Sequence, residues 1–479
     1  MWGSYNIMEK SISMIQKAYA KGELTARELV LEYLERIATY DSKLNSIIEL
    51  NPDALHIAEA LDYERKAVGL RSVLHGIPVL LKDNIITGDK MHTSAGSYAL
   101  RDFYGKEDAF LVKKLRKAGA IILGKTNMTE WANYMSDSMP AGYSSRGGHV
   151  YSPYGKDLNT GGSSTGSAIA VTSNFCTVAI GTETTGSIIN PSSENGIVGI
   201  KPTLGLVSRT GIIPVSLMQD TAGPMGKTVE DAAILLGALV GYDKKDWITI
   251  GSKTNRYTDY TQFLNESGLR GKRIGIPREH FYDSLSKDES TIMDSMIKIM
   301  KQQGAEIIDN VTISGAKELE SKHYILYECK AEINAFLKKH SESLPFSTIT
   351  ELMAYHEAHA DKMLVYGQAY FDFADKTSGS LTEPEYLSHR MKELKQSRES
   401  LNQALAEYKI DVLLFPSDKG ARIVDKAGYP SITIPAGSLN NGQPFGVTFS
   451  AEAFSEPKLI EMAYALEQHT KLRIAPLVG

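Results

Sequence analysis

Two segments rich in glycine and hydroxyl residues carry the groups best suited to chemistry in this 479-residue chain. They read Gly161-Gly-Ser-Ser-Thr-Gly-Ser167 and Gly181-Thr-Glu-Thr-Thr-Gly-Ser187. The second follows an apolar run at 177–180, which predicts a buried strand that opens into consecutive backbone N–H groups beside a hydroxyl. Such N–H groups can stabilise the negative charge that develops when a carbonyl is attacked. The alternative is two ordinary turns, because Gly and Ser dominate turns.

A lysine upstream makes this pair of segments more specific. Lys82 follows the apolar run Ile77-Pro-Val-Leu-Leu81, which predicts a strand. A lysine at a strand end is normally solvated and charged. It can act as a base only if burial or a neighbouring group lowers its pKa by about three units.

The stretch Gly119-Ala-Ile-Ile-Leu-Gly-Lys-Thr126 fits the phosphate-loop pattern in letters but not in context. A phosphate loop must follow a buried strand and open a helix. Here the residues between the two glycines themselves predict the strand, and a charged helix at 110–118 precedes them. A step from helix through turn to strand is the better interpretation.

Three further patterns carry less weight. Gly162-Ser163-Ser164-Thr165-Gly166 fits a nucleophile elbow, but polar residues stand where that motif needs an apolar strand. His280 or His469 could complete a Ser-His-Asp site, yet neither has a distinctive setting. His356 and His359 could form half of a metal site, without an evident third ligand. We expect neither a metal ion nor a cofactor.

The elements that must position these residues alternate between helix and strand. Thr25 and Glu28 form a capping box before an apolar-periodic helix. Strand-like runs lie at 77–81, 120–123, 177–180, 273–276, 306–313, 412–415, 431–434 and 447–449, with helical patterns at 110–118 and 228–240. This alternation predicts an α/β fold with a parallel or mixed sheet. Strand candidates run from end to end, so we expect one domain, in which the mostly helical region 317–408 forms a layer or a cap over a site.

Composition and charge exclude several classes of function. The chain is 42% hydrophobic and 23% charged, with a formal net charge of -5. It lacks the basic footprint that nucleic-acid binding requires, so we expect no nucleic-acid partner. The longest apolar run, 232–240, is too short to span a membrane. Two distant cysteines, Cys176 and Cys329, and no signal-peptide pattern favour a soluble cytoplasmic protein.

Over nearly its whole length the sequence resembles the amidase signature family. The matching stretches are His75–Asn84, Thr93–Ser97, Leu123–Glu130, Gly161–Pro202 and Ala427–Gly437. The resemblance implies a single α/β domain over residues 1–479, with a central mixed β-sheet covered by helices on both faces. It also implies hydrolysis of a carboxylic amide to an acid and ammonia or an amine, without a cofactor.

The resemblance carries catalytic roles over to three residues. Ser187 matches the nucleophile, Ser163 the bridging serine, whose bond to Gly162 is typically cis, and Lys82 the base. Neutral Lys82 would draw a proton from Ser187 through Ser163, and the relay would return a proton to the leaving amine. The backbone N–H groups that match the oxyanion hole are those of Thr184, Thr185 and Gly186.

The substrate expectation comes from the branch of the family that the chain resembles. The segments 142–149 and 212–225 look most like the peptide-amidase branch, which removes ammonia from C-terminal peptide amides. We expect a peptide or small-molecule amide substrate and a monomer or homodimer. The family often has Gly in place of Thr165 and Thr185, so the pocket would be narrower at Thr185. The expected substrate contacts are Arg146, Gly161, Gly162 and Asp220.

The main alternative is the glutamine-hydrolysing component of a tRNA-dependent amidotransferase. That component uses the same three residues but needs partner chains and passes ammonia to an activated substrate. The segment Gln219-Asp220-Thr221 and the loop at Arg146 favour the free hydrolase. A binding protein without activity is disfavoured, because all three catalytic positions carry the required residue types.

Overall fold

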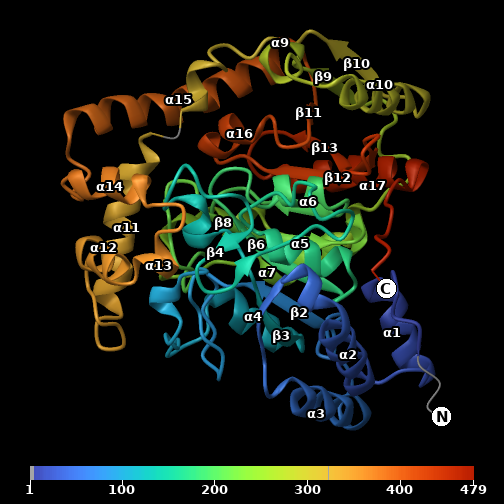
Figure 1. Cartoon of the computed structure of the whole chain (residues 1–479). Helices are drawn as coiled ribbons and strands as arrows, with labels where there is room; N and C mark the ends of the chain where they lie inside the picture. Colours follow the sequence, from blue (N-terminus) through green and yellow to red (C-terminus); the bar gives the residue numbers. More distant parts are fainter. Residues whose placement is uncertain (1–4, 322, 479) are drawn as a thin grey trace.

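The computed structural model describes residues 5–321 and 323–478. Within them, eleven strands form one mixed sheet in the order β1-β3-β2-β6-β8-β7-β12-β13-β11-β9-β10 (Figure 1). Its strands are β1 (Ile47–Leu50), β2 (Pro78–Lys82), β3 (Ile121–Thr126), β6 (Val178–Glu183), β7 (Val198–Lys201), β8 (Thr221–Gly226), β9 (Arg273–Ile276), β10 (Glu306–Asp309), β11 (Val412–Pro416), β12 (Ser431–Ser438) and β13 (Pro444–Ser450). β4 (Tyr143–Ser144) and β5 (Gly148–His149) pair separately. The predicted α/β fold with a mixed sheet is confirmed.

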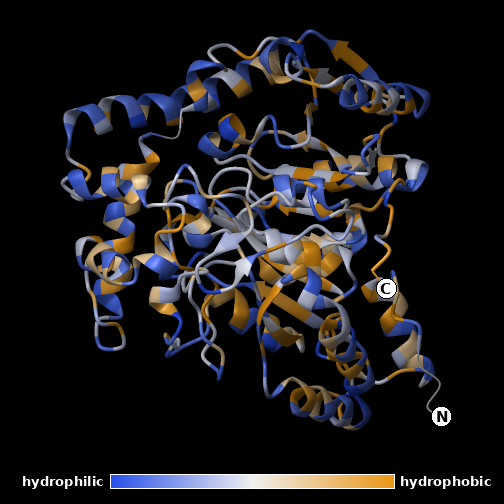
Figure 2. Cartoon of the chain, viewed as in Figure 1, coloured by the Kyte–Doolittle hydropathy of each residue, from blue (hydrophilic) through white to orange (hydrophobic). Residues whose placement is uncertain are grey.

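Helices pack against both faces of this sheet. Side chains at Gly181 and Gly223 would point toward Ser164 and Ile188, at the starts of α5 and α6, whereas one at Gly226 would point toward Asp231 of α7. The helices are α1 (Ile12–Lys21), α2 (Ala26–Leu44), α3 (Ala54–Ala67), α4 (Phe110–Ala118), α5 (Thr165–Thr172), α6 (Ile189–Glu194), α7 (Val229–Leu239), α8 (Ser252–Asn255), α9 (Arg278–Phe281), α10 (Lys287–Gln302), α11 (Ile325–Lys339), α12 (Ile349–Ala358), α13 (Ala360–Met363), α14 (Ala369–Lys376), α15 (Pro384–Glu407), α16 (Ala421–Ala427) and α17 (Glu456–Thr470). Apolar residues concentrate on the strands and the inner helix faces (Figure 2).

Local sequence signals explain several of these boundaries. Thr25 and Glu28 form the predicted capping box at the start of α2. Gly119 ends α4 in a left-handed conformation (φ 87°), and the strand β3 then runs on to Thr126. The fully buried Lys125 amine donates to the Thr93 hydroxyl at 2.8 Å and to the Ile85 carbonyl. The segment therefore forms the expected step from helix to strand, and its lysine is committed to protein partners.

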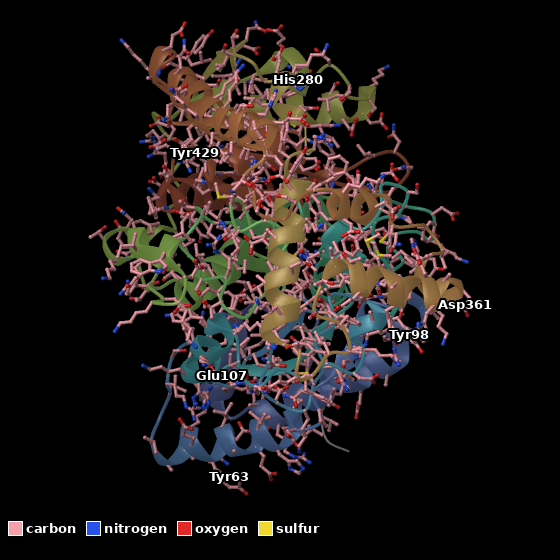
Figure 3. The ribbon with its side chains drawn as sticks, turned by 90° about the vertical axis from the view of Figure 1, so that its left-hand side faces the viewer. Tyr63, Tyr98, Glu107, His280, Asp361 and Tyr429 are labelled. Carbon is pink, nitrogen blue, oxygen red and sulfur yellow. The ribbon has the colours of Figure 1, made fainter. Side chains whose placement is uncertain are left out.

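The region 317–408 consists largely of helices outside the sheet. α11 to α14 stack along the left side of the molecule in Figure 1, and α15 crosses its top. Figure 3 views this layer face on, with Tyr98 beside the segment that carries Asp361, and Lys362 Nζ donates to the Tyr98 hydroxyl at 3.1 Å. A buried ion pair joins Arg390 of α15 to Glu328 of α11, with Nε and Oε1 2.7 Å apart.

Segments from near both ends of the described chain lie together (Figure 1). Two guanidinium nitrogens of Arg473 each lie 2.8 Å from a carboxylate oxygen of Glu9. Arg473 also donates to the Gly196 carbonyl at 2.8 Å. None of the helices in residues 5–321 and 323–478 has the apolar length needed to cross a membrane.

Candidate active site

The amine of Lys82 lies buried beneath the first glycine-rich segment. β2 ends at this residue, which has no exposed surface. Its Nζ lies 2.8 Å from Ser163 Oγ and 3.0 Å from the Thr182 carbonyl oxygen. Burial lowers the pKa of Lys82 to about 7, although the negative charges of Glu183 and Asp220 oppose that shift. A substantial fraction of this lysine is therefore neutral near pH 7.

Ser163 is held by the turn that opens α5. The Gly162–Ser163 peptide bond is cis, as the family resemblance implies. The Gly162 N–H donates to Asn190 Oδ1 at 2.9 Å, and the Thr165 hydroxyl donates to the Gly161 carbonyl at 2.7 Å. Gly161 adopts a left-handed conformation (φ 63°), and a Cβ there would lie 2.7 Å from the backbone of Pro191. Only glycine fits both conditions.

Ser187 lies in the loop between β6 and α6, next to Ser163. The Ser164 N–H donates to the Ser187 carbonyl at 3.2 Å, so the two glycine-rich segments are in direct contact. Ser163 and Ser187 both border a cavity of about 290 Å³. The residues around this cavity are Ala132, Asn133, Tyr134, Gly162, Ser163, Thr185, Gly186, Ser187, Glu320, Asp418, Lys419, Ala421 and Arg422. The structure thus brings the three predicted catalytic residues together.

The loop Thr184–Ser187 is held by contacts that sequence reasoning did not foresee. The Thr184 hydroxyl donates to Asp220 Oδ1 at 2.6 Å, and the Tyr134 hydroxyl donates to Thr185 Oγ1 at 3.3 Å. The Gly186 N–H donates to Asp425 Oδ2 at 3.0 Å. Gly186, expected as an oxyanion-hole donor, is therefore engaged by a carboxylate. Within the described residues, the N–H groups of Thr185 and Ser187 have no protein acceptor.

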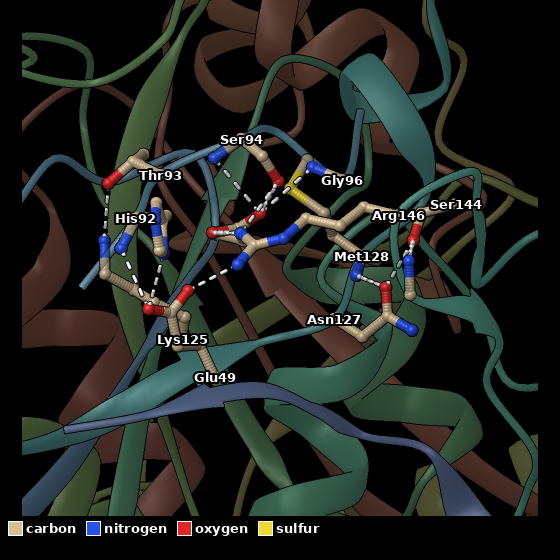
Figure 4. Close-up of polar contacts among 12 residues, drawn as sticks. Glu49, His92, Thr93, Ser94, Gly96, Lys125, Asn127, Met128, Ser144 and Arg146 are labelled. Atoms are coloured by element: carbon tan, nitrogen blue, oxygen red, sulfur yellow. Dashed lines mark hydrogen bonds and ion pairs between the residues drawn. The ribbon is translucent and has the colours of Figure 1, made fainter. Parts of the chain in front are cut away.

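Arg146, expected to contact substrate, belongs instead to a network of charged and polar groups (Figure 4). Its guanidinium pairs with Glu49, donates to Ser94 Oγ at 3.2 Å, and lies 3.6 Å from Asp83 Oδ1. Glu49 Oε1 also lies 2.8 Å from His92 Nδ1. Arg146 is not among the residues that border the cavity, and two buried or half-buried carboxylates account for its position.

Of the other expected substrate contacts, only Gly162 borders the cavity. The Asp220 carboxylate accepts the Val215 and Ser216 N–H groups at 2.8 and 2.9 Å, in addition to the Thr184 hydroxyl. Burial raises the pKa of Asp220 to about 6. Asp220 therefore supports the loop that precedes Ser187, and Gly161 supports Ser163 from behind the cavity wall.

Part of the cavity wall comes from segments without a recognisable sequence signal. Trp131, Ala132 and Asn133 are consecutive left-handed residues, with φ of 49°, 54° and 70°. Non-glycine residues rarely adopt this conformation, so no propensity predicts it. The opposite wall, with Asp418 and Arg422, follows β11. The one usable signal there was a carboxylate among apolar residues, in Ile423-Val-Asp425.

The histidine pair of the sequence analysis does not form a common site. His356 is buried, and its Nδ1 lies 2.9 Å from Gln368 Oε1. Burial lowers the pKa of His356 to about 4, so it is neutral. His359 Nδ1 lies 2.9 Å from the Tyr355 carbonyl oxygen. In the part of the chain that the structure describes, no three metal-binding side chains converge.

A mixed sheet that holds a buried lysine against a cis-linked serine, beside a second serine on a glycine-rich loop, is the arrangement of amide hydrolases. The family model described as amidase matches residues 28–425. The chain belongs to the amidase family and is a hydrolase that acts on amide C–N bonds.

Individual relatives place the chain more closely. A protein described as "Probable amidase" from Arabidopsis thaliana is 42% identical, over 99% of this chain and 92% of the relative. The crystal structure of the peptide amidase PAM with the competitive inhibitor chymostatin is 41% identical, with a TM-score of 0.93, over 98% of this chain and all of that chain. The native peptide amidase of Stenotrophomonas maltophilia is 40% identical, with a TM-score of 0.92, over 99% of both chains. The glutamyl-tRNA(Gln) amidotransferase component of the same family from Alkaliphilus metalliredigens is 32% identical, over 96% of both.

Proposed function

We propose that this amidase cleaves its substrate through an acyl-enzyme on Ser187, with Ser163 and Lys82 as its proton relay. The observation that carries the proposal is the 2.8 Å contact between the buried Lys82 amine and Ser163 Oγ, beside a cavity that Ser187 also borders. A neutral amine at this distance can accept the serine proton, and that serine can in turn accept the proton of the nucleophile.

The reaction then has two halves. Ser187 Oγ attacks the amide carbon as its proton passes through Ser163 to Lys82, and N–H groups of the loop stabilise the oxyanion. We assign that role to Thr184, Thr185 and Ser187, because Asp425 engages the Gly186 N–H. The relay returns the proton to the departing nitrogen, and water releases the acid from Ser187 along the reverse path.

We infer that the substrates are short peptides with a C-terminal amide. The likeness to peptide amidases at 40–41% identity over nearly the full length supports this inference. The cavity volume of about 290 Å³ suits a small ligand, and its wall offers polar groups for a peptide backbone. The amidotransferase component is less similar, at 32% identity, which favours a free hydrolase over one part of an assembly.

The test is ammonia release from a panel of dipeptide amides, aliphatic and aryl amides, and glutamine. The native chain should act best on the peptide amides, and Ser187→Ala should lower the rate to background. Ser138→Ala, which removes an exposed hydroxyl, is the matched control and should keep full activity. Unchanged release by Ser187→Ala would refute the nucleophile. Release from glutamine alone would favour the amidotransferase component.

A further inference from the structure

A buried ion pair lies directly behind the loop that carries Ser187. Asp425 of α16 is 1% exposed, and Lys201 at the end of β7 is 2% exposed. Asp425 Oδ1 lies 3.1 Å from Lys201 Nζ, and Asp425 Oδ2 accepts the Gly186 N–H at 3.0 Å. The proposed reaction uses neither side chain. Burying a charged pair is costly, and well-packed apolar residues often replace such pairs without loss of stability.

Gly186 is where the course of this loop is decided. It adopts a left-handed conformation (φ 71°) between Thr185 and Ser187. Its N–H belongs to the peptide group that joins it to Thr185, so a hydrogen bond to that N–H fixes the orientation of one peptide plane. The planes on either side carry the N–H groups of Thr185 and Ser187, and their directions depend on the fixed one.

The loop is held at a second point by another buried carboxyl group. Glu183, the last residue of β6, accepts the N–H groups of Ile188 and Ile189, the latter at 2.9 Å. Burial and the nearby Asp425 raise the pKa of Glu183 well above its usual range. Glu183 therefore fastens the loop where it enters α6, and Asp425 fastens its middle.

We propose that Asp425 is a positioning residue for the amidase reaction. By accepting the Gly186 N–H, it orients the peptide planes that aim the Thr185 and Ser187 N–H groups, and Lys201 neutralises its charge. The proposal rests on the proposed function in one respect, because it takes Ser187 as the nucleophile. It also gives a reason for the costly ion pair: a carboxylate is the stronger acceptor for a backbone N–H.

Two double variants separate the hydrogen bond from the buried charge. Lys201→Met with Asp425→Asn removes both charges and keeps an oxygen that can accept the Gly186 N–H. Lys201→Met with Asp425→Leu has nearly the same side-chain volume but no acceptor. We expect the asparagine variant to keep kcat within about threefold of the native value. The leucine variant should lose about 10- to 100-fold in kcat, with KM changed less than about twofold, because small misplacements at a reacting centre cost this much.

Two readouts accompany kcat: the thermal midpoint, and the rate at which a fluorophosphonate labels Ser187. Labelling needs no amide substrate and should slow in the leucine variant alone. Equal kcat and labelling rates in the two double variants would overturn the proposal, because the acceptor would then be irrelevant. If the leucine variant does not fold, the asparagine variant still decides: a kcat loss above tenfold at a native thermal midpoint overturns the proposal. An inactive native chain would instead refute the proposed function.

Discussion

At the scale of single residues, the chemistry depends on how burial changes an ordinary lysine. Lys82 lies at the end of a strand, where a lysine is normally solvated, yet it has no exposed surface. Burial is the largest influence on its pKa, and the carboxyl groups of Glu183 and Asp220 moderate it. The result, a pKa of about 7, places the neutral form within reach at physiological pH.

This pKa predicts how activity depends on pH. The neutral lysine is the active form, so kcat/KM should rise through an inflection near pH 7 and level off above it. Asp220→Asn should move the inflection to lower pH, because the carboxylate favours the charged lysine. The measurement is the pH profile of kcat/KM for a peptide amide. An inflection above pH 9 in the native chain would contradict a buried Lys82 base.

Ser163 offers a second prediction at this scale. Ser163→Ala removes the hydroxyl that lies 2.8 Å from Lys82 Nζ, so proton transfer from Ser187 loses its bridge. We expect kcat to fall by about 10²- to 10⁴-fold with little change in KM. Ser167→Ala is the control, since its buried hydroxyl contacts Thr126 and the Ile180 carbonyl instead. A similar loss of kcat in both variants would point to general damage to the segment.

At the scale of elements, the network of Arg146 joins β1, β2 and the loops that follow them. Glu49 belongs to β1, and Asp83 directly follows β2, with its carboxylate accepting the Ser94 hydroxyl. Arg146→Met should leave these carboxylates without their cation and reduce the free energy of unfolding by about 1–3 kcal/mol. Urea unfolding and KM are the measurements. A KM raised tenfold at unchanged stability would restore Arg146 as a substrate contact.

Sequence reasoning succeeded where a local pattern decides the element. The apolar runs that became β2, β6 and β11 needed no tertiary information, nor did the capping box of α2. It missed β8, because Thr221-Ala-Gly-Pro-Met-Gly226 contains a proline and two glycines that normally indicate a loop. Burial between β6 and β7 makes this segment a central strand.

The site divides in the same way. Lys82, Ser163 and Ser187 stand in motifs that a reader of the sequence can find. Asp425 could not be found so, because its contact with Gly186 spans 239 positions and depends on how α16 packs behind the loop. Arg146 and Asp220 were expected at the substrate for their residue types, but buried partners near each one use that polarity within the protein.

At the scale of the whole molecule, the helical layer is connected to the catalytic loop through Glu328. Its carboxylate, in α11, accepts the Arg390 guanidinium of α15 at 2.7 Å and the Tyr386 hydroxyl at 2.8 Å. It also accepts the Ser216 hydroxyl. Ser216 in turn donates its N–H to Asp220, which holds Thr184. The layer is thus tied to the loop that carries Ser187 by a continuous set of contacts.

Breaking this tie should affect stability and catalysis together. Glu328→Gln leaves the fully buried Arg390 without a counter-ion and should cost about 3–5 kcal/mol of unfolding free energy, with a fall in kcat/KM. The double variant with Arg390→Met should recover most of the stability, because no lone charge remains buried. Denaturant unfolding and steady-state kinetics test both. Native stability in the single variant would show that the pair contributes little.

The contact between Glu9 and Arg473 has a consequence for how the chain could be rewired. These residues are 464 positions apart, yet they form one ion pair on one side of the molecule. A circular permutant could join residues 478 and 5 by a short peptide and open at the exposed turn 440–442 between β12 and β13. In such a chain β13 and α17 would be synthesised first and Glu9 would follow soon after Arg473. A remote pairing would become a local one in a fold whose contacts are otherwise the same.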